Sequence, residues 1–304
     1  MDLFDTIRLC NNLNQYLSAP RFWLPCNVVI LATYIKKNKT TQDKIEKLIT
    51  TENARAYLRN IRFYENLYNI PQHTTRMKEG ISYSPLTIID THNTVNIATD
   101  TITSCIKNNI NKDDLVCELD NVIGELHDNV CSHGKTFGFS MAQVYRERIE
   151  FAISDLGGGF LKVLQRAGVP NINNDLDAIK WCLIKNNTST KFENREELDD
   201  PWRQSVPWDL LGQSPMGNYS FHEEDNHQGL GLDALLELHK KFSDSKLQIA
   251  SGKIGVEYRN GDIYRTDSNV EWEGVAINLT IPTNKTPCYN TTNKDLDEIL
   301  NMIG

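Results

Sequence analysis

The sequence lacks three features that would set it apart from ordinary globular proteins. It has no long hydrophobic run, because the longest, CNVVILATYI at residues 26–35, is about half of the roughly 20 residues that a membrane-spanning helix needs. It has no C-x-x-C pair, and its seven cysteines are scattered, which argues against a disulfide framework or a zinc site. It has no excess of basic residues, since its formal net charge is -8, which disfavours nucleic acid as a direct ligand.

The first residues, MDLFDTIRLC, also lack the basic stretch and following apolar stretch of an ordinary signal peptide. The cysteines are then typical of small buried hydrophobic side chains in a reducing compartment. We therefore expect a cytoplasmic protein without a membrane partner.

The chain of 304 residues is long enough for two domains of about 100 to 200 residues each. Residues 1–85 predict a small α/β or mostly helical domain with a regulatory or interaction role, since apolar residues recur at three and four positions over 40–67. A polar, turn-forming segment then predicts a linker before a second domain at about 90–283.

The second domain begins with a predicted amphipathic helix at residues 111–130. Its apolar residues recur at helical spacing, and they are Leu115, Leu119, Val122, Leu126 and Val130. Glu125 and Asn129 are four residues apart and therefore share one face of this helix. For the neighbouring His127 and His133 we favour packing or capping over metal binding, because no complete ligand set accompanies them.

The stretch GELHDNVCSHGKT at 124–136 contains two competing nucleotide-binding signatures. Gly134-Lys135-Thr136 has the ending of a phosphate-binding P-loop, but that motif needs a glycine five positions earlier, where Asn129 stands, and a preceding strand. Here the motif follows a helix. The carboxylate and amide of Glu125 and Asn129 are the signature that remains.

Two strands are predicted next, at 135–145 and 148–154, and the second leads into Asp155-Leu-Gly-Gly-Gly159. Three glycines after an acid allow a ligand to approach the backbone, and they also suit a tight turn. A helix is predicted at 173–186, followed by an aperiodic segment at about 187–228 that is typical of a lid or a disordered loop.

The sequence GLGL at 229–232 opens a further predicted helix at 230–242, where glycines either expose N–H groups to an anion or form a hinge. Short strands follow, with a hairpin turn at Asn260-Gly261. Residues 284–304 predict a linker and a short C-terminal helix.

This ordered set of motifs resembles the GHKL superfamily, the Bergerat-fold ATPases that include DNA gyrase, a heat-shock chaperone, histidine kinases and mismatch-repair ATPases. The resemblance covers about residues 90–283. It implies an α+β fold, a two-layer α/β sandwich with a mixed, mostly antiparallel sheet and helices on one face. Residues 1–85 resemble a STAS-like regulatory module through Phe22 to Pro25 and Asn53 to Leu58.

The resemblance implies a role for each matching residue. Asn129 would hold Mg2+ against the phosphates, Glu125 would be the catalytic carboxylate that activates water, and Asp155 would accept a hydrogen bond from the adenine amino group. Further cofactor-binding residues are implied beside the base, before the lid and at the phosphates: Gly157, Gly159, Thr190, Lys191, Gly229, Leu230, Gly231 and Leu232. For Thr190 and Lys191 a solvated helix end remains an equal alternative.

The chain departs from the family pattern at three points. Val130 stands where a small residue is usual, Val275 follows Gly274 where threonine is common, and no histidine occupies a phospho-acceptor context. What the resemblance implies is a Mg2+-dependent ATP-binding protein, a slow ATPase that couples nucleotide state to lid closure and to an unidentified protein partner. Alternatives are a serine/threonine kinase of the anti-sigma type and a non-catalytic ATP-sensing scaffold, each as a monomer or a homodimer.

Overall fold

The computed structural model describes residues 1–10, 12–18, 23–72, 76, 78–109, 113–134, 136–185, 187 and 231–283. Outside these ranges lie the predicted C-terminal helix and, apart from Asn187, the predicted lid. The predicted ligand-binding residues Thr190, Lys191, Gly229 and Leu230 also lie outside the described residues. These parts of the sequence analysis stay predictions.

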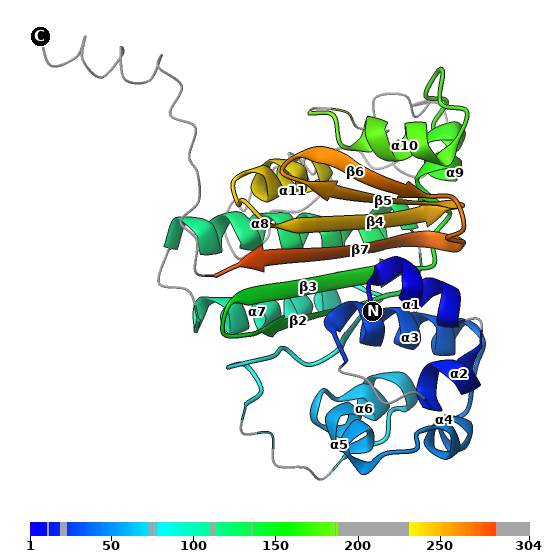
Figure 1. Ribbon diagram of the computed structural model, residues 1–304, viewed down its shortest axis with the longest axis vertical. Helices are drawn as coiled ribbons and strands as arrows, with labels where there is room; N and C mark the ends of the chain where they lie inside the picture. Colours follow the sequence, from blue (N-terminus) through cyan, green and yellow to red (C-terminus); the bar gives the residue numbers. More distant parts are fainter. Residues whose placement is uncertain are drawn as a thin grey trace, which may run out of the picture.

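A seven-stranded sheet with the order β1-β2-β3-β7-β4-β5-β6 forms the centre of the molecule (Figure 1). The strands are β1 (Thr87–Ile89), β2 (Gly138–Val144), β3 (Arg148–Asp155), β4 (Lys246–Gly252), β5 (Ile254–Arg259), β6 (Asp262–Asp267) and β7 (Trp272–Pro282). The predicted mixture of helices with a largely antiparallel sheet is confirmed. The prediction of a mixed sheet is wrong, because every paired set of described strands is antiparallel.

Short hairpins explain the antiparallel pairing of β2 with β3, β4 with β5 and β5 with β6, since parallel strands need long crossover connections. The predicted turn between β5 and β6 has positive φ at both Asn260 (52°) and Gly261 (87°), as the tightest hairpin turns require. Strand β7 comes last in the chain but lies between β3 and β4. It therefore joins the hairpin that ends in Asp155 to the C-terminal strands.

One face of the sheet is covered by helices α7 (His92–Lys107), α8 (Asp113–Asn129) and α11 (Gly231–Lys240). Side chains of β3 alternate as expected for a strand: Phe151 and Ile153 pack toward these helices, whereas Ala152 packs on the other side. The predicted apolar stripe of α8 is buried in this core. It holds α8 flat against the sheet, so that the end of the helix lies beside the end of β3.

The opposite face is covered by α1 (Leu3–Cys10) and α3 (Pro25–Lys37) (Figure 1). Of the helices within residues 90–283, α7, α8 and α11 cover one face, and the second face is covered by helices of residues 1–85, a layer that the sequence did not predict. The second face carries Ala152 of β3, Ala250 of β4 and Ala276 of β7 beside the larger Phe139 and Met141 of β2, and the apolar helix α3 packs against β2 and β3. The N-terminal helices and the sheet consequently share one hydrophobic core.

The rest of the N-terminal region consists of α2 (Leu13–Ser18), α4 (Gln42–Leu48), α5 (Glu52–Asn60) and α6 (Phe63–Tyr68). The described residues up to 72 thus form helices and no strand, which is the helical alternative of the prediction; an α/β module of the STAS type is not formed by them. Thr51 caps α5 by accepting a hydrogen bond from the Ala54 N–H, as N-terminal threonines commonly do.

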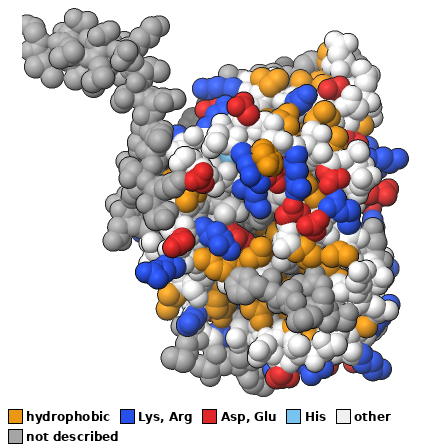
Figure 2. All heavy atoms as spheres, viewed as in Figure 1, with side chains coloured by type: hydrophobic (Ala, Val, Ile, Leu, Met, Phe, Trp, Pro, Cys, Tyr) orange, Lys and Arg blue, Asp and Glu red, His pale blue; other side chains and the backbone are white. Residues whose placement is uncertain are grey.

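Two short helices, α9 (Gly159–Arg166) and α10 (Asp175–Cys182), lie at one end of the sheet and contact β4. On the side of the molecule that Figure 2 shows, basic and acidic side chains lie next to one another. Ion pairs among the described residues include Arg8–Asp267 and Arg259–Glu257. No described helix combines the length and the apolar composition needed to cross a membrane.

The side chain of His127 holds the last turn of α8 in place through two hydrogen bonds. Its side chain is fully buried, with Nδ1 at 2.8 Å from Thr99 Oγ1 on α7 and Nε2 at 2.8 Å from Ser140 Oγ on β2. Burial lowers the pKa of the ring to about 3. His127 is thus a neutral packing residue, in agreement with the sequence-based interpretation.

We expect His127→Gln to remove the acid sensitivity that His127 confers. In the wild type, the unfolded ring takes up a proton as the pH falls below about 6.5 and the folded ring does not, so the free energy of unfolding decreases by about 1.4 kcal/mol per pH unit. At pH 7.5 the free energy of unfolding of the variant should be lower than that of the wild type by roughly 1 to 3 kcal/mol. At pH 5 this difference should shift by about 2 kcal/mol in favour of the variant, because only the wild type loses stability to protonation of His127 in the unfolded state. Urea unfolding at both pH values measures this, with the exposed His92→Gln as control. The prediction would be contradicted if the difference in free energy of unfolding between the His127 variant and the wild type were the same at both pH values.

Candidate functional site

Asp155 ends strand β3 at the wall of a pocket and is only 8% exposed. Its Oδ1 accepts the main-chain N–H groups of Gly157 at 2.7 Å and Val275 at 3.3 Å. Its Oδ2 accepts no hydrogen bond from the described residues. One carboxylate oxygen is therefore fixed by the protein, and the other is available to a ligand.

Two glycines allow the chain to close around this carboxylate. A Cβ at Gly274 would lie 2.3 Å from the main-chain oxygen of Asp155 and 2.5 Å from its Oδ1, which is too close for any side chain. Gly159 has a positive φ of 70°, and a Cβ there would meet Ser251 Oγ at 2.8 Å. A side chain at Gly159 or Gly274 would therefore disrupt the chain around Asp155, and the turn of Gly157, Gly158 and Gly159 also lines the pocket.

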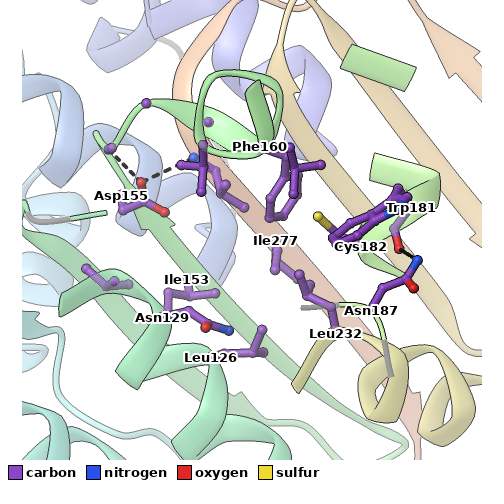
Figure 3. A pocket seen from close by; sticks show the side chains of 17 residues that line it. Leu126, Asn129, Ile153, Asp155, Phe160, Trp181, Cys182, Asn187, Leu232 and Ile277 are labelled. Atoms are coloured by element: carbon purple, nitrogen blue, oxygen red, sulfur yellow. Dashed lines mark hydrogen bonds between the residues drawn. The ribbon is translucent and has the colours of Figure 1, made fainter. Parts of the chain in front are cut away.

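Asn129 lies at the end of α8, where the α-helix gives way to a π-helical turn at Val130–Gly134. Figure 3 shows Asn129 and Asp155 at the same side of the pocket, with Ile153 between them. The amide comes from α8 and the carboxylate from β3. Because α8 is packed along the sheet through its apolar stripe, the two groups reach one cavity from different elements.

Glu125 is half-buried one helical turn before Asn129, but the face of α8 that lines the pocket is made by Leu126, Asn129 and Val130. Residues four apart in an α-helix, such as Glu125 and Asn129, differ in direction around the helix axis by about 40°, which is on the order of the width of one side chain. The structure therefore places Glu125 beside the pocket and not among its described lining residues.

The remaining walls are mostly apolar. The pocket contains about 880 Å³ of open space, part of which is open solvent at its mouth. Phe160 and Ile277 lie at its middle, and Trp181 and Cys182 of α10 lie at the end away from Asp155 (Figure 3). No lysine or arginine is among its described lining residues.

Both valines that depart from the family pattern are accommodated. Val130 is 3% exposed, and Gly138 of β2 makes room for it, since a Cβ at Gly138 would lie 3.0 Å from a Val130 methyl group. The side chain of Val275 lines the pocket while its N–H holds Asp155. Neither valine closes the pocket.

The structure thus brings together five of the predicted residues as pocket walls: Asn129, Asp155, Gly157, Gly159 and Leu232. Gly231 is the first residue of α11, adjacent to Leu232. The sequence analysis missed Leu126, Phe160 and Leu164 as pocket residues, although Phe160 directly follows the predicted glycine turn. Trp181 and Cys182 also line the pocket, from within the helix that was predicted at 173–186.

Burial raises the pKa of Asp155 to about 6, although the two N–H groups act to lower it. At neutral pH the folded protein therefore holds a charged carboxylate at a cost in stability. Buried carboxylates kept at such a cost are common at functional sites. This cost in stability makes Asp155 a candidate ligand-binding residue.

We expect Asp155→Asn to stabilise the protein at pH 7.5, because the amide retains an oxygen acceptor for both N–H groups without a buried charge. The contribution of the wild-type carboxyl to stability is fully present below pH 4 and is lost as the pH rises through 6, so the gain should be roughly 1 to 3 kcal/mol at pH 7.5 and vanish near pH 4. Urea unfolding at the two pH values measures it. If the variant were less stable than the wild type at both pH values, the charged carboxylate would be shown to stabilise the fold.

Comparison of the chain with protein-family models, with curated proteins and with solved structures found no match.

Proposed function

We propose that the protein binds MgATP in the pocket between α8, the glycine turn and α11, and that it hydrolyses ATP slowly, as an ATPase of the Bergerat-fold, GHKL type. The observation that carries the proposal is the buried Asp155 carboxylate. One of its oxygens accepts two main-chain N–H groups, and the other, which accepts no hydrogen bond from the described residues, lies at the wall of a mostly apolar pocket. The N-terminal helices would be an additional layer on the back of the ATPase fold.

The free oxygen favours adenine as the base. A carboxylate oxygen only accepts hydrogen bonds, and the adenine edge offers a single exocyclic amino group as donor. A guanine edge offers two adjacent N–H donors and would need both oxygens of Asp155, one of which is already occupied. The apolar side chains of Ile153, Val275 and Ile277 suit the flat faces of a base.

The other polar group of the pocket, Asn129, fits the phosphate end. Its amide oxygen is a hard ligand of the kind that Mg2+ accepts, and Mg2+ usually keeps several waters and binds substrate phosphates. No cluster of three or more histidine, cysteine or acidic side chains able to hold a metal occurs among the described residues. Asn129 would therefore be a single protein ligand to the ion, whose role when bound is to neutralise phosphate charge.

Glu125 would act as the general base. In hydrolysis, the oxygen of a water molecule forms a bond to the γ-phosphorus, the bond from that phosphorus to the bridging oxygen breaks, and the water proton passes to the Glu125 carboxylate. The products are ADP and phosphate. The half-buried position of Glu125 beside the pocket is compatible with a water between it and the substrate.

The nucleotide state would be read by a protein partner, in keeping with slow turnover in which a change of conformation is the output. Transfer of the phosphate to a hydroxyl group of a partner, or ATP sensing without hydrolysis, would use the same binding groups. No described feature favours either one over hydrolysis.

We expect Glu125→Gln to bind MgADP with wild-type affinity and to release phosphate from γ-labelled ATP at a rate lower by at least about a hundredfold, as loss of a general base predicts. Calorimetry and phosphate release measure the two properties. Glu118→Gln is the matched control, since Glu118 is on the same helix and pairs with Lys241 outside the pocket. Unchanged phosphate release would remove Glu125 from the mechanism.

The same labelled ATP distinguishes the alternatives. Label on a protein would indicate a kinase, and binding without label transfer or release would indicate a sensor. Absence of nucleotide binding by the wild type would overturn the proposal as a whole.

A further inference from the structure

The backbone ladder between β3 and β7 stops one residue before it reaches the pocket. The pairing runs from Arg148 opposite Pro282 to Ser154 opposite Ala276. In the same register the next pair would be Asp155 and Val275, both of which belong to their strands. Instead the Val275 N–H donates to the side chain of Asp155.

This diversion leaves the main-chain carbonyl of Asp155 without its expected strand partner. The indole of Trp272 takes that place: its Nε1–H donates to the Asp155 carbonyl oxygen at 3.1 Å. Trp272 is the first residue of β7 and is only 5% exposed. Gly274, between Trp272 and Val275, has no side chain to block this approach.

We infer that Trp272 is a positioning residue for Asp155: its indole N–H satisfies the Asp155 carbonyl and thereby leaves the Val275 N–H to the carboxylate. A buried carbonyl and a buried carboxylate oxygen compete for one main-chain donor, and an unsatisfied buried acceptor is costly. Without the indole donor, the carbonyl takes the Val275 N–H, and the carboxylate loses one of its two anchors.

The consequence is both geometric and electrostatic. Hydrogen bonds to a carboxylate favour its charged form, so loss of the Val275 donor raises the pKa of Asp155 and loosens its orientation. Of the charged side chains on the neighbouring elements, Glu273 on β7 interacts with Lys37 on α3 and with Lys162 on α9. Glu273 pairs with Lys37 at 2.5 Å, and burial and the two N–H groups are what act on the pKa of Asp155.

The role of Trp272 can be tested in the full chain by replacing it with phenylalanine, and also with benzothienylalanine, which keeps the shape of tryptophan but has no N–H. Trp23→Phe is the matched control, because Trp23 is similarly buried at 6% exposure but packs on Tyr16 in the N-terminal region. Carbon-13 NMR of labelled aspartate carboxyls follows the pKa of Asp155 directly, with the Asp155→Asn variant identifying its signal.

We expect both replacements at position 272 to raise the pKa of Asp155 by about one unit and to weaken MgADP binding at pH 7 by about tenfold, as loss of one charge-assisted hydrogen bond predicts. The Trp23 variant should change neither. The affinity measurement rests on the proposed function, whereas the NMR titration needs no ligand.

The possible results distinguish a failure of the proposed nucleotide binding from a failure of the positioning role of Trp272. If the wild type binds no nucleotide, the proposed function fails, and the NMR titration still decides the role of Trp272. If benzothienylalanine at position 272 leaves the pKa of Asp155 unchanged, the positioning role is overturned, whatever the wild type binds. If Trp272→Phe does not fold, the isosteric replacement alone gives the decision.

Discussion

The site depends on one buried carboxylate held by main-chain N–H groups. Gly157 and Val275 stabilise the buried Asp155 carboxylate by supplying two donors to the same oxygen. Those donors are available because the glycine turn folds back over the carboxylate on one side and the β7 strand departs from regular pairing on the other. A regular β-ladder at this point would consume the Val275 N–H and leave the carboxylate without it.

The N-terminal helices, which cover the second face of the sheet, also contact the strands at the Asp155 end of the pocket. Helix α3 packs against β2 and β3, and the hydroxyl of Ser154 donates a hydrogen bond to Thr33 of α3 at 2.8 Å in the buried core. Ser154 directly precedes Asp155. The Lys37–Glu273 pair connects the end of α3 to the residue before Gly274. The N-terminal helices therefore contact both strands that build the Asp155 end of the pocket, which gives this region a physical route to the site.

The sequence could predict those parts of the molecule that depend on local pattern. The helix with Asn129, the strand leading into Asp155 and the Asn260–Gly261 turn follow from spacing and from glycine chemistry, and all are observed. The second covered face could not be predicted, because α3 is apolar all round and its pattern does not say what it packs against. The role of Trp272 could not be predicted either, since it depends on the register of β3 against β7, two strands more than a hundred residues apart.

The composition of the pocket bears on how the proposed ligand would be held. Its described walls are apolar apart from Asp155, Asn129, Asn187 and main-chain groups, and they include no cationic side chain. A triphosphate carries several negative charges, which such walls cannot neutralise. In the proposed complex the base would therefore be held by protein groups already in place, whereas the phosphates would depend on Mg2+ and on N–H groups at the start of α11. Loss of the γ-phosphate would then change contacts at the α11 end of the pocket and leave the Asp155 end unaltered. A partner able to distinguish ATP from ADP would therefore have to contact the α11 end.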